Sequence, residues 1–442
     1  MCYEKKTNSE IIGSLKAFLL LSVVPDKYKQ YKGAFTRERK LPFSMLISLM
    51  IKALRKKIGV EITFFYERLV SLSLADEAES LTASGFCQSR QKLKPEFFQD
   101  GLHHFVDSFY TDNDGRVKLW HGKRLLAVDG SIIDLPYSKT LEEIYGTYHN
   151  QHQSLHIKAK ISLLYDVLNE MVLDGRMGKY TDSERGLALF HLPRAQKGDI
   201  ILYDRGYPSF DFIYQHQQKE IDFVMRTKVG WSNVVKDFVA SGVVSGQVDL
   251  QVNRADSVVG KEYNHQTKLT VRLVRVELST GEIEVLITSL LDEANFESAI
   301  FKELYFKRWG IETRYDVLKN TLQLEHFSGT SQVVIEQDFY ITLLIANMEA
   351  LLREEVNQQI KQKYKHRKHQ YQVNISACVG LLREKITDLL LGKHPKQVLD
   401  YLTTVFAQHT EAVRPNRSFP RKYDKYKIKK VPKAVKNRKT NL

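Results

Sequence analysis

Two short runs of apolar residues, each closed by an aspartate, constrain the fold of this chain more than any other feature. Residues 124–131 read Arg-Leu-Leu-Ala-Val-Asp-Gly-Ser, and residues 199–207 read Asp-Ile-Ile-Leu-Tyr-Asp-Arg-Gly-Tyr. A continuous apolar run bounded by turn residues is typical of a strand that is buried on both faces of a parallel or mixed sheet. The sequence therefore predicts an α/β protein in which Asp129 and Asp204 end two such strands.

The elements around these runs follow a known order. Residues 160–167 and 170–177 predict a hairpin, and residues 183–191 and 210–220 predict helices. A further strand is expected at 222–228. The resulting order of strand, strand, strand, helix, strand, helix, strand is that of the ribonuclease-H-like fold, with a mixed sheet. We therefore expect a ribonuclease-H-like core.

A different pattern covers residues 230–290, where apolar and polar residues alternate, as in Val248, Leu250 and Val252. Alternation is typical of hairpin strands with one solvated face. This region is expected to be an all-β insertion. A long helix over 295–325 and another over 331–360 are expected to follow it.

A length of 442 residues suggests two to four domains. The N-terminal part is predicted to be an α-helical DNA-binding domain, and the C-terminal part is predicted to be helical, then basic. The expected boundaries are 1–118 for the N-terminal domain, 119–230 for the first part of the core, 231–292 for the insertion, 293–330 for the second part of the core, 331–413 for a C-terminal helical region that could mediate dimerisation, and 414–442 for a basic disordered tail.

Asp129 and Asp204 would lie side by side in this strand order. The first and fourth strands are neighbours in the ribonuclease-H-like fold, and open α/β sheets place their sites at the carboxyl edge. Two carboxylates there repel each other, whereas Mg²⁺ between them stabilises both in the ionised form. For either aspartate alone, a turn after the strand is the simpler interpretation. The two together favour a metal site.

The segment 304–322 predicts a helix with two adjacent stripes. One stripe, roughly 60° wide at about 100° per residue, consists of Tyr305, Arg308, Glu312 and Lys319. The other stripe is apolar, can pack on the sheet, and consists of Leu304, Ile311, Leu318 and Leu322. A solvated face of ion pairs would require neither a tyrosine nor this alignment. The helix therefore presents functional side chains along the border of its buried face.

The polar stripe has the spacing Tyr-x2-Arg-x3-Glu-x6-Lys, which resembles the signature of the DDE transposases of the insertion-sequence-four family. Residues 128–131 and 203–207 are similar to the contexts of the first two aspartates of that family. The likeness extends from the Ser-Gly-Phe-Cys-Gln-Ser-Arg-Gln-Lys-Leu stretch near the N-terminus to the Arg-Pro-Asn-Arg-Ser-Phe-Pro-Arg stretch near the C-terminus. It implies that Asp129, Asp204 and Glu312 are the catalytic and metal-binding residues.

The resemblance also implies a mechanism. Two Mg²⁺ ions, for which Mn²⁺ can substitute, would activate a water or a DNA 3′-hydroxyl and stabilise the leaving oxygen. Arg308 and Lys319 would neutralise the phosphate next to the cut. Tyr305 would bind a phosphate or stack on a displaced base, and Arg205 is a further expected phosphate ligand.

The distribution of charge points to DNA as well. The chain carries a net charge of +14, and residues 414–442 hold twelve Lys or Arg against one Asp. This tail is expected either to lie along phosphates or to be simply solvated. Near the N-terminus, residues 82–98 predict a short basic helix of a helix-turn-helix, in which Arg90 and Lys92 contact DNA. Ordinary helix packing is the alternative.

Other features narrow the class of protein. Three dispersed cysteines exclude a disulfide scaffold or a thiolate zinc finger, and the longest apolar runs are too short to cross a bilayer. We expect a cytoplasmic, nucleoid-associated transposase that moves its own element by cut-and-paste. It would act as a homodimer on double-stranded DNA, with terminal inverted repeats and target DNA as partners. A decayed, end-binding repressor and a metal-dependent nuclease of the same fold are the alternatives.

Overall fold

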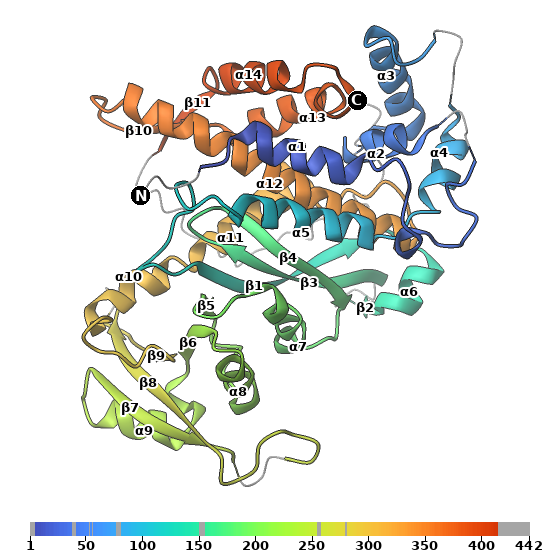
Figure 1. Ribbon diagram of the computed structural model, residues 1–442. Helices are drawn as coiled ribbons and strands as arrows, with labels where there is room; N and C mark the ends of the chain where they lie inside the picture. Colours follow the sequence, from blue (N-terminus) through green and yellow to red (C-terminus); the bar gives the residue numbers. More distant parts are fainter. Residues whose placement is uncertain are drawn as a thin grey trace, which may run out of the picture. The chain divides into compact units, whose positions relative to one another are not determined.

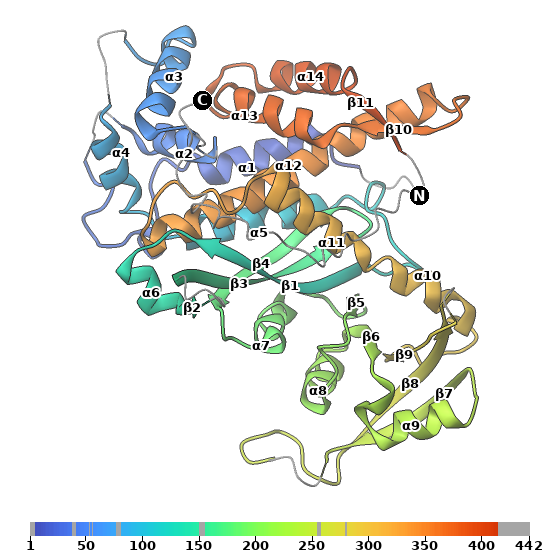
Figure 2. The same ribbon diagram turned by 180° about the vertical axis from the view of Figure 1, so that it is seen from behind.

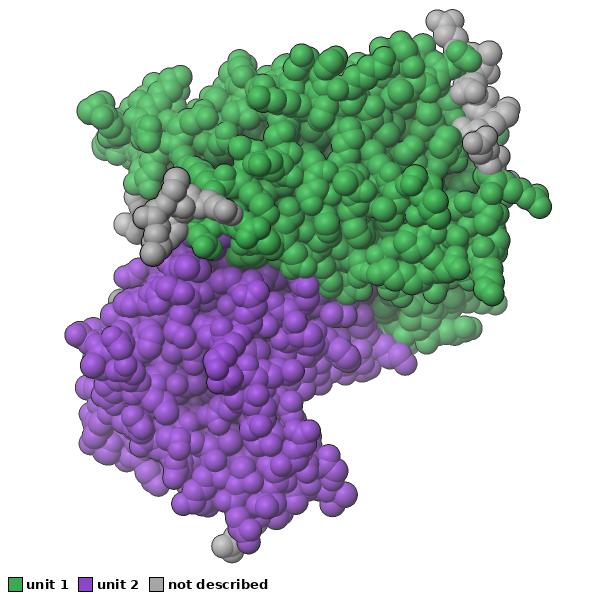
Figure 3. Space-filling view, viewed as in Figure 1, with its two compact units in different colours: residues 1–116, 133–159, 316–442 green, residues 117–132, 160–315 purple. Residues whose placement is uncertain are grey.

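The computed structural model describes residues 5–37, 41–52, 54, 56–76, 81–149, 155–253, 258–278 and 281–413, and the predicted basic tail lies outside them. The chain divides into two compact units (Figure 3). Unit 1 comprises Met1–Arg116, Ile133–Ala159 and Asp316–Leu442, and unit 2 comprises Val117–Ile132 and Lys160–Tyr315. No helix in the described ranges combines the length and the apolar character needed to cross a membrane.

Unit 2 is built on a mixed sheet whose strands follow the order β4-β3-β1-β5-β6-β9-β8-β7 (Figure 1). Strand β5 pairs in parallel with both β1 and β6. The pairing of β1 with β5 confirms the expectation that the first and fourth predicted strands are neighbours. The bounds are β1 (Leu125–Leu135), β3 (Leu155–Asp166), β4 (Met171–Lys179), β5 (Ile200–Tyr203), β6 (Asp222–Thr227), β7 (Ser245–Gln251), β8 (Lys268–Glu277) and β9 (Ile283–Thr288); β1 and β3 also extend into unit 1.

The region expected to be an all-β insertion differs from that expectation in two ways. It contains a helix, α9 (Asn233–Ala240), whose Val235 and Phe238 are buried where the helix packs on β7 and β8. Its strands also continue the core sheet, because β9 pairs antiparallel with β6, with Val224 opposite Thr288. An open edge of β6 would leave backbone groups unpaired, and β9 satisfies them. The strands of the predicted core and those of the predicted insertion therefore form one continuous sheet.

The helices of unit 2 pack on this sheet. Helix α7 (Glu184–Leu189) is capped by Ser183 and packs on β4, while α8 (Phe210–Gln218) packs on β6 and β8. The prediction of a single long helix over 295–325 is wrong. The chain forms α10 (Phe301–Phe306), a tight turn at Lys307 and Arg308, and then α11 (Trp309–Asp316). The predicted apolar stripe is nevertheless buried throughout.

Unit 1 is helical (Figure 2). Its long helix α12 is buried on all sides over residues 341–353 and packs against α1, α2, α5, α13 and α14. A helix that is apolar all round belongs in a core. The helices of unit 1 are α1 (Asn8–Leu19), α2 (Phe43–Ile51), α3 (Ile58–Ser71), α4 (Ala83–Arg90), α5 (Glu96–Tyr110), α6 (Lys139–Tyr145), α12 (Gln332–Lys363), α13 (Ile375–Leu391) and α14 (Pro395–Phe406), and its short strands are β2 (Thr147–His149), β10 (Gln370–Val373) and β11 (Thr410–Val413).

Candidate active site

Asp129 and Asp204 come from neighbouring parallel strands of unit 2. The pairing of β1 with β5 places Ala127 opposite Leu202, so the two aspartates follow this register by two residues each. Strand β1 continues past Asp129, which is therefore not at a strand end as the sequence suggested. The parallel pairing itself stops at Ala127, so the edge of β1 beside Asp129 is open toward the end of β5. Both carboxylates are partly exposed.

Arg308 is the centre of the carboxylate cluster. One guanidinium nitrogen, Nη2, lies 2.7 Å from Glu312 Oε1, and Nη1 lies 3.9 Å from Asp129 Oδ2. The Arg308 side chain is 5% exposed, whereas that of Glu312 is 36% exposed. The turn between α10 and α11 places it there, since the Arg308 amide bonds to the Tyr305 carbonyl three residues earlier. Such a tight turn within a helical segment often marks a functional position.

Asp204 is held by a second arginine. Arg226 on β6 lies 2.9 Å from Asp204 Oδ1 through Nη2 and 2.6 Å from Glu284 Oε1 through Nη1. The backbone amide of Arg205 also donates to Asp204 Oδ1. Three elements, β5, β6 and β9, therefore fix one aspartate. The sequence analysis missed Arg226 and Glu284, although a charged residue inside the apolar run Asp-Phe-Val-Met-Arg-Thr was a usable signal.

Two tyrosines brace the backbone around these aspartates. The Tyr315 hydroxyl donates to the Asp129 carbonyl at 2.8 Å, and the Tyr305 hydroxyl donates to the Tyr203 carbonyl at 3.2 Å. Tyr305 is only 7% exposed. In this structure it supports the end of β5 rather than offering a ring or a hydroxyl to DNA, which differs from the role expected for it.

The two aspartates differ in their protonation. Burial, with smaller contributions from Glu312 and Asp204, raises the pKa of Asp129 to about 6, against the opposing effects of the Arg308 charge and the Gly130 amide. Burial also acts to raise the pKa of Asp204, but the Arg205 amide and the Arg226 guanidinium outweigh it, so that this pKa is lowered. Arg308 adds to this lowering. The ionised form of Asp129 is therefore disfavoured by burial and by the neighbouring carboxylates. A bound cation would stabilise that ionised form.

Carboxylate oxygens are the ligands that Mg²⁺ and Mn²⁺ prefer. The three carboxylates are electrostatically coupled and share Arg308 as a counter-charge. They do not converge on one point, because no group of three acidic, histidine or cysteine side chains in the described part of the chain is close enough to hold a metal ion. Their oxygen atoms are of the kind that binds a divalent ion, whereas in this structure Arg308 contacts Glu312 and lies near Asp129, and Arg226 contacts Asp204.

The remaining predicted residues lie in different surroundings. Arg205 is exposed directly after Asp204. Lys319 belongs to unit 1, in the π-helical segment Val317–Thr321, where burial lowers its pKa. Lys92 is half-buried in the turn after α4. Of the polar stripe, unit 2 brings together Tyr305, Arg308 and Glu312.

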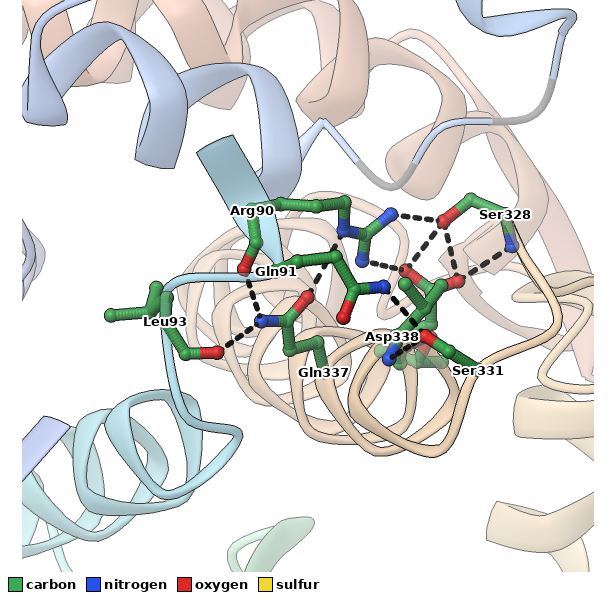
Figure 4. Close-up of polar contacts among 9 residues, drawn as sticks. Arg90, Gln91, Leu93, Ser328, Ser331, Gln337 and Asp338 are labelled. Carbon is green, nitrogen blue, oxygen red and sulfur yellow. Dashed lines mark hydrogen bonds and ion pairs between the residues drawn. The ribbon is translucent and has the colours of Figure 1, made fainter. Parts of the chain in front are cut away.

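The surroundings of Arg90 differ from those expected of the DNA contact predicted for it. It is 1% exposed, and Figure 4 shows its guanidinium enclosed by residues at the start of α12 and just before it. Nε donates to Gln337 Oε1 and Nη2 to Asp338 Oδ1, each at 3.0 Å, and Nη1 donates to Ser328. Thr82 caps the start of α4 by accepting a hydrogen bond from the Gly85 amide. With its donors used, Arg90 cannot contact a base in this structure.

The family and the relatives that match this chain are described as transposases. The sequence profile of a family described as Transposase DDE domain matches residues 120–348, a range that contains Asp129, Asp204 and Glu312. Transposase InsG for insertion sequence element IS4 from Escherichia coli (strain K12) is 23% identical over 331 residues, covering 71% of this chain and 70% of the relative.

Two further relatives come from Bacillus thuringiensis. The transposase for insertion sequence element IS231F (subsp. israelensis) is 20% identical over 332 residues, covering 65% of this chain and 68% of the relative. That for IS231B (subsp. berliner) is 20% identical over 435 residues, covering 86% and 89%. Among solved structures, a piggyBac transposase synaptic complex with hairpin DNA shares 10% identity at a TM-score of 0.39, over 92% of this chain and 79% of that chain. That likeness is too slight to support an argument.

Proposed function

The chain belongs to the transposase DDE domain family, and on that premise we propose that Asp129, Asp204 and Glu312 are its catalytic, metal-binding residues. The protein is a DNA transposase of the insertion-sequence-four family, an enzyme that acts on DNA and, like its family, requires a divalent metal. The finer proposal is cut-and-paste transposition: hydrolysis of phosphodiester bonds at the ends of the element, followed by strand transfer to target DNA.

One observation carries this proposal. Asp129, Asp204 and Glu312 are separated by 75 and 108 positions in the sequence. Arg308 contacts Glu312 and lies 3.9 Å from Asp129, and its charge also lowers the pKa of Asp204. Burying the Arg308 side chain costs free energy unless its charge is compensated. Here the carboxylates of Glu312 and Asp129 compensate the charge. They do so near the carboxyl edge of an α/β sheet, where such folds place their sites.

The residues of unit 2 have separable roles in this proposal. Asp129, Asp204 and Glu312 would hold two Mg²⁺ ions, for which Mn²⁺ can substitute. Bound ions of this kind lower the pKa of an attacking water or hydroxyl and neutralise the leaving oxygen. Arg308 would be available to a phosphate oxygen if metal held its carboxylate partners, since a guanidinium matches phosphate geometry.

Other groups position the DNA or the ligands. Arg226 keeps Asp204 ionised and oriented through its ion pair, and Tyr305 holds the backbone just before it. We propose Arg205 and Lys319 as phosphate contacts. Phosphoryl transfer needs mainly such positioning and charge neutralisation from the protein.

The partner is DNA, and we propose terminal inverted repeats and target DNA as the sites that are bound. A homodimer would hold two ends together. The N-terminal region 1–118 is proposed to bind DNA, and the region 331–413 is proposed to contribute to dimerisation.

The triad is tested by substitutions that remove charge and keep shape: Asp129→Asn, Asp204→Asn and Glu312→Gln. Each variant should still bind end DNA, but cleavage should fall roughly a hundredfold or more, because a ligand to the metal is lost. Mn²⁺ binding, measured by electron paramagnetic resonance without DNA, should weaken in parallel. Glu303→Gln is the matched control, since this exposed carboxylate on α10 forms an ion pair with Lys307 four residues later.

Undiminished cleavage by Glu312→Gln would contradict the assignment. A wild-type protein that binds ends but never cuts them would favour the decayed repressor. A protein that cuts ends but never joins them to target DNA would favour a simple nuclease.

A further inference from the structure

A run of basic side chains ends the long helix α12 of unit 1. Residues 361–368 include four lysines and one arginine, and no acidic residue occurs between Glu355 and Glu384. All five basic side chains are exposed, and within the described part of the chain none of them pairs with a carboxylate. We call these residues the basic turn: Lys361, Lys363, Lys365, Arg367 and Lys368.

The fold holds the arginine of the basic turn in place. The Arg367 amide donates to the Tyr364 carbonyl at 3.0 Å, which closes the turn after the helix. The Arg367 guanidinium lies 4.3 Å from the centroid of the Tyr364 ring and 4.9 Å from that of Tyr371 on β10. An arginine that rests on aromatic rings keeps the N–H donors at its edge for other partners. Arg367 is therefore pre-positioned and still exposed.

The dipole of α12 accounts for only part of this charge. Lys361 and Lys363 belong to the last turn of the helix, where a cation is stabilised by the carbonyl ends. Lys365, Arg367 and Lys368 lie beyond the end of the helix at Lys363. The effect of the dipole fades within the last turn, so it gives no reason for these three cations. Five like charges within eight residues repel one another, and an anion would relieve that repulsion.

Strand pairing places the start of the basic tail beside the basic turn. Strand β10 lies next to α12 (Figure 2) and pairs antiparallel with β11, with Gln370 opposite Val413. The tail begins at the residue after Val413. The acidic residue of these two strands, Glu411, already accepts hydrogen bonds from Gln372 and Asn374. Two basic segments that are distant in the sequence therefore meet at one end of unit 1.

We propose that the basic turn binds the phosphate backbone of the DNA substrate, an inference that rests on the proposed function for the identity of its partner. Small anions are usually bound in concave sites, whereas cations on an exposed turn suit an extended polyanion. Duplex DNA carries one charge per about 1.7 Å of its axis, and the edge of a guanidinium matches a phosphate. The contact would not distinguish sequences, because phosphate contacts position without specifying.

The test uses the full-length protein without metal and two duplexes of equal length, an element end and a random sequence, over a series of salt concentrations. Lys365→Gln/Lys368→Gln should weaken binding of both duplexes by the same factor, about tenfold or more. The slope of log affinity against log salt should flatten by up to about two units, because each phosphate contact contributes about 0.9.

Lys393→Gln/Lys396→Gln is the matched control. Both lysines are exposed at the start of α14 in the same unit, so this variant loses the same net charge. Its salt slope should equal that of the wild type.

A second measurement needs no variant. Acetylation of the wild-type protein, followed by mass spectrometry, reports which lysines a bound duplex covers. A saturating duplex should protect Lys365 and Lys368 from the reagent, and Lys393 and Lys396 should react as they do without DNA.

The proposal is overturned if Lys365→Gln/Lys368→Gln has the same salt slope as the control, or if its two lysines stay reactive in the complex. A changed ratio of end to random affinity would also overturn it, since the turn would then read sequence. These outcomes are distinct from a failure of the proposed function. A wild-type protein that binds neither duplex would contradict DNA as the partner, whereas normal wild-type binding with an unchanged slope in the variant contradicts the basic turn alone.

Discussion

Arg308 shows how a single residue can organise a site. Its side chain is almost fully buried, contacts Glu312 four residues later, and approaches Asp129 from a distant strand. Without this guanidinium, three partly buried carboxylates would repel one another, and the pKa of Asp129, already raised to about 6 by burial, would rise further. Arg308 therefore stabilises the arrangement of carboxylates that the proposed function requires.

His216 gives unit 2 a built-in sensitivity to acid. Its Nδ1 donates to the Phe212 carbonyl at 2.7 Å, so that its Nε2 accepts from the Tyr203 hydroxyl at 2.8 Å. Burial lowers the pKa of His216 to about 4. An unfolded histidine titrates near pH ~6.5, so the unfolded chain binds an extra proton between these values. The free energy of unfolding should therefore fall as the pH drops through this window, by up to about 3 kcal/mol.

Urea unfolding at about pH 7.5 and about pH 5 measures this effect. His216→Gln removes the titrating ring, so its unfolding free energy should fall less between the two pH values than that of the wild type. His265→Gln is the control, because His265 is exposed in the same unit. An equal fall in wild type and His216→Gln would show that other groups cause the acid sensitivity.

At the scale of elements, the contacts of α4 decide its role. Arg90 and Gln91 tie the end of this helix to α12 and to the residues before it, and Gln337 returns bonds to the carbonyls of Arg90 and Leu93 (Figure 4). Every donor group of the Arg90 guanidinium has a partner among Gln337, Asp338 and Ser328. The network joins elements that are about 240 residues apart in the sequence, so it fixes tertiary structure.

Arg90→Ala should therefore destabilise unit 1 instead of altering DNA specificity. Removing the arginine leaves Asp338 without its ion-pair partner, at a cost of about 3 kcal/mol. The urea midpoint should fall, and binding to end DNA and to random duplex should fall by the same factor. Gln88→Ala, on the exposed side of α4, should change neither. A selective loss of end recognition with an unchanged midpoint would restore the base-reading role.

At the scale of the whole molecule, positive charge is concentrated at the C-terminal end of the sequence. Residues 414–442 carry twelve basic residues and one acidic residue, against a net charge of +14 for the chain. The carboxylates proposed for catalysis all lie in unit 2, before residue 316. The charge expected to attract DNA and the groups proposed to cut it are thus in different parts of the chain.

Truncation after Val413 should weaken binding to all duplexes similarly. Each phosphate contact releases counterions, so losing several contacts should flatten the slope of log affinity against log salt by a few units. The ratio of end to random affinity should persist, since phosphate contacts position without specifying. Cleavage at saturating DNA should also survive. An unchanged slope would mean that the tail does not contact DNA, and a collapsed ratio would mean that it reads sequence or joins subunits.

The sequence by itself determined the elements whose pattern is local. The apolar runs before Asp129 and Asp204 predicted neighbouring strands, and the structure pairs those strands in parallel. The stripe of Leu304, Ile311 and Leu318 is buried as expected. These features depend on the periodicity with which apolar side chains must be buried, and that periodicity can be read along the chain.

Only the tertiary structure decided which partner each charged residue meets. The sequence placed Arg90 toward DNA, but α12 supplies buried acceptors for it. It did not specify that Arg226 would pair with Asp204, or that β9 would extend the core sheet beside β6. A charge or an open strand edge is stabilised by whichever complementary group the fold brings near. That group lies tens to hundreds of residues away, so no local pattern specifies it.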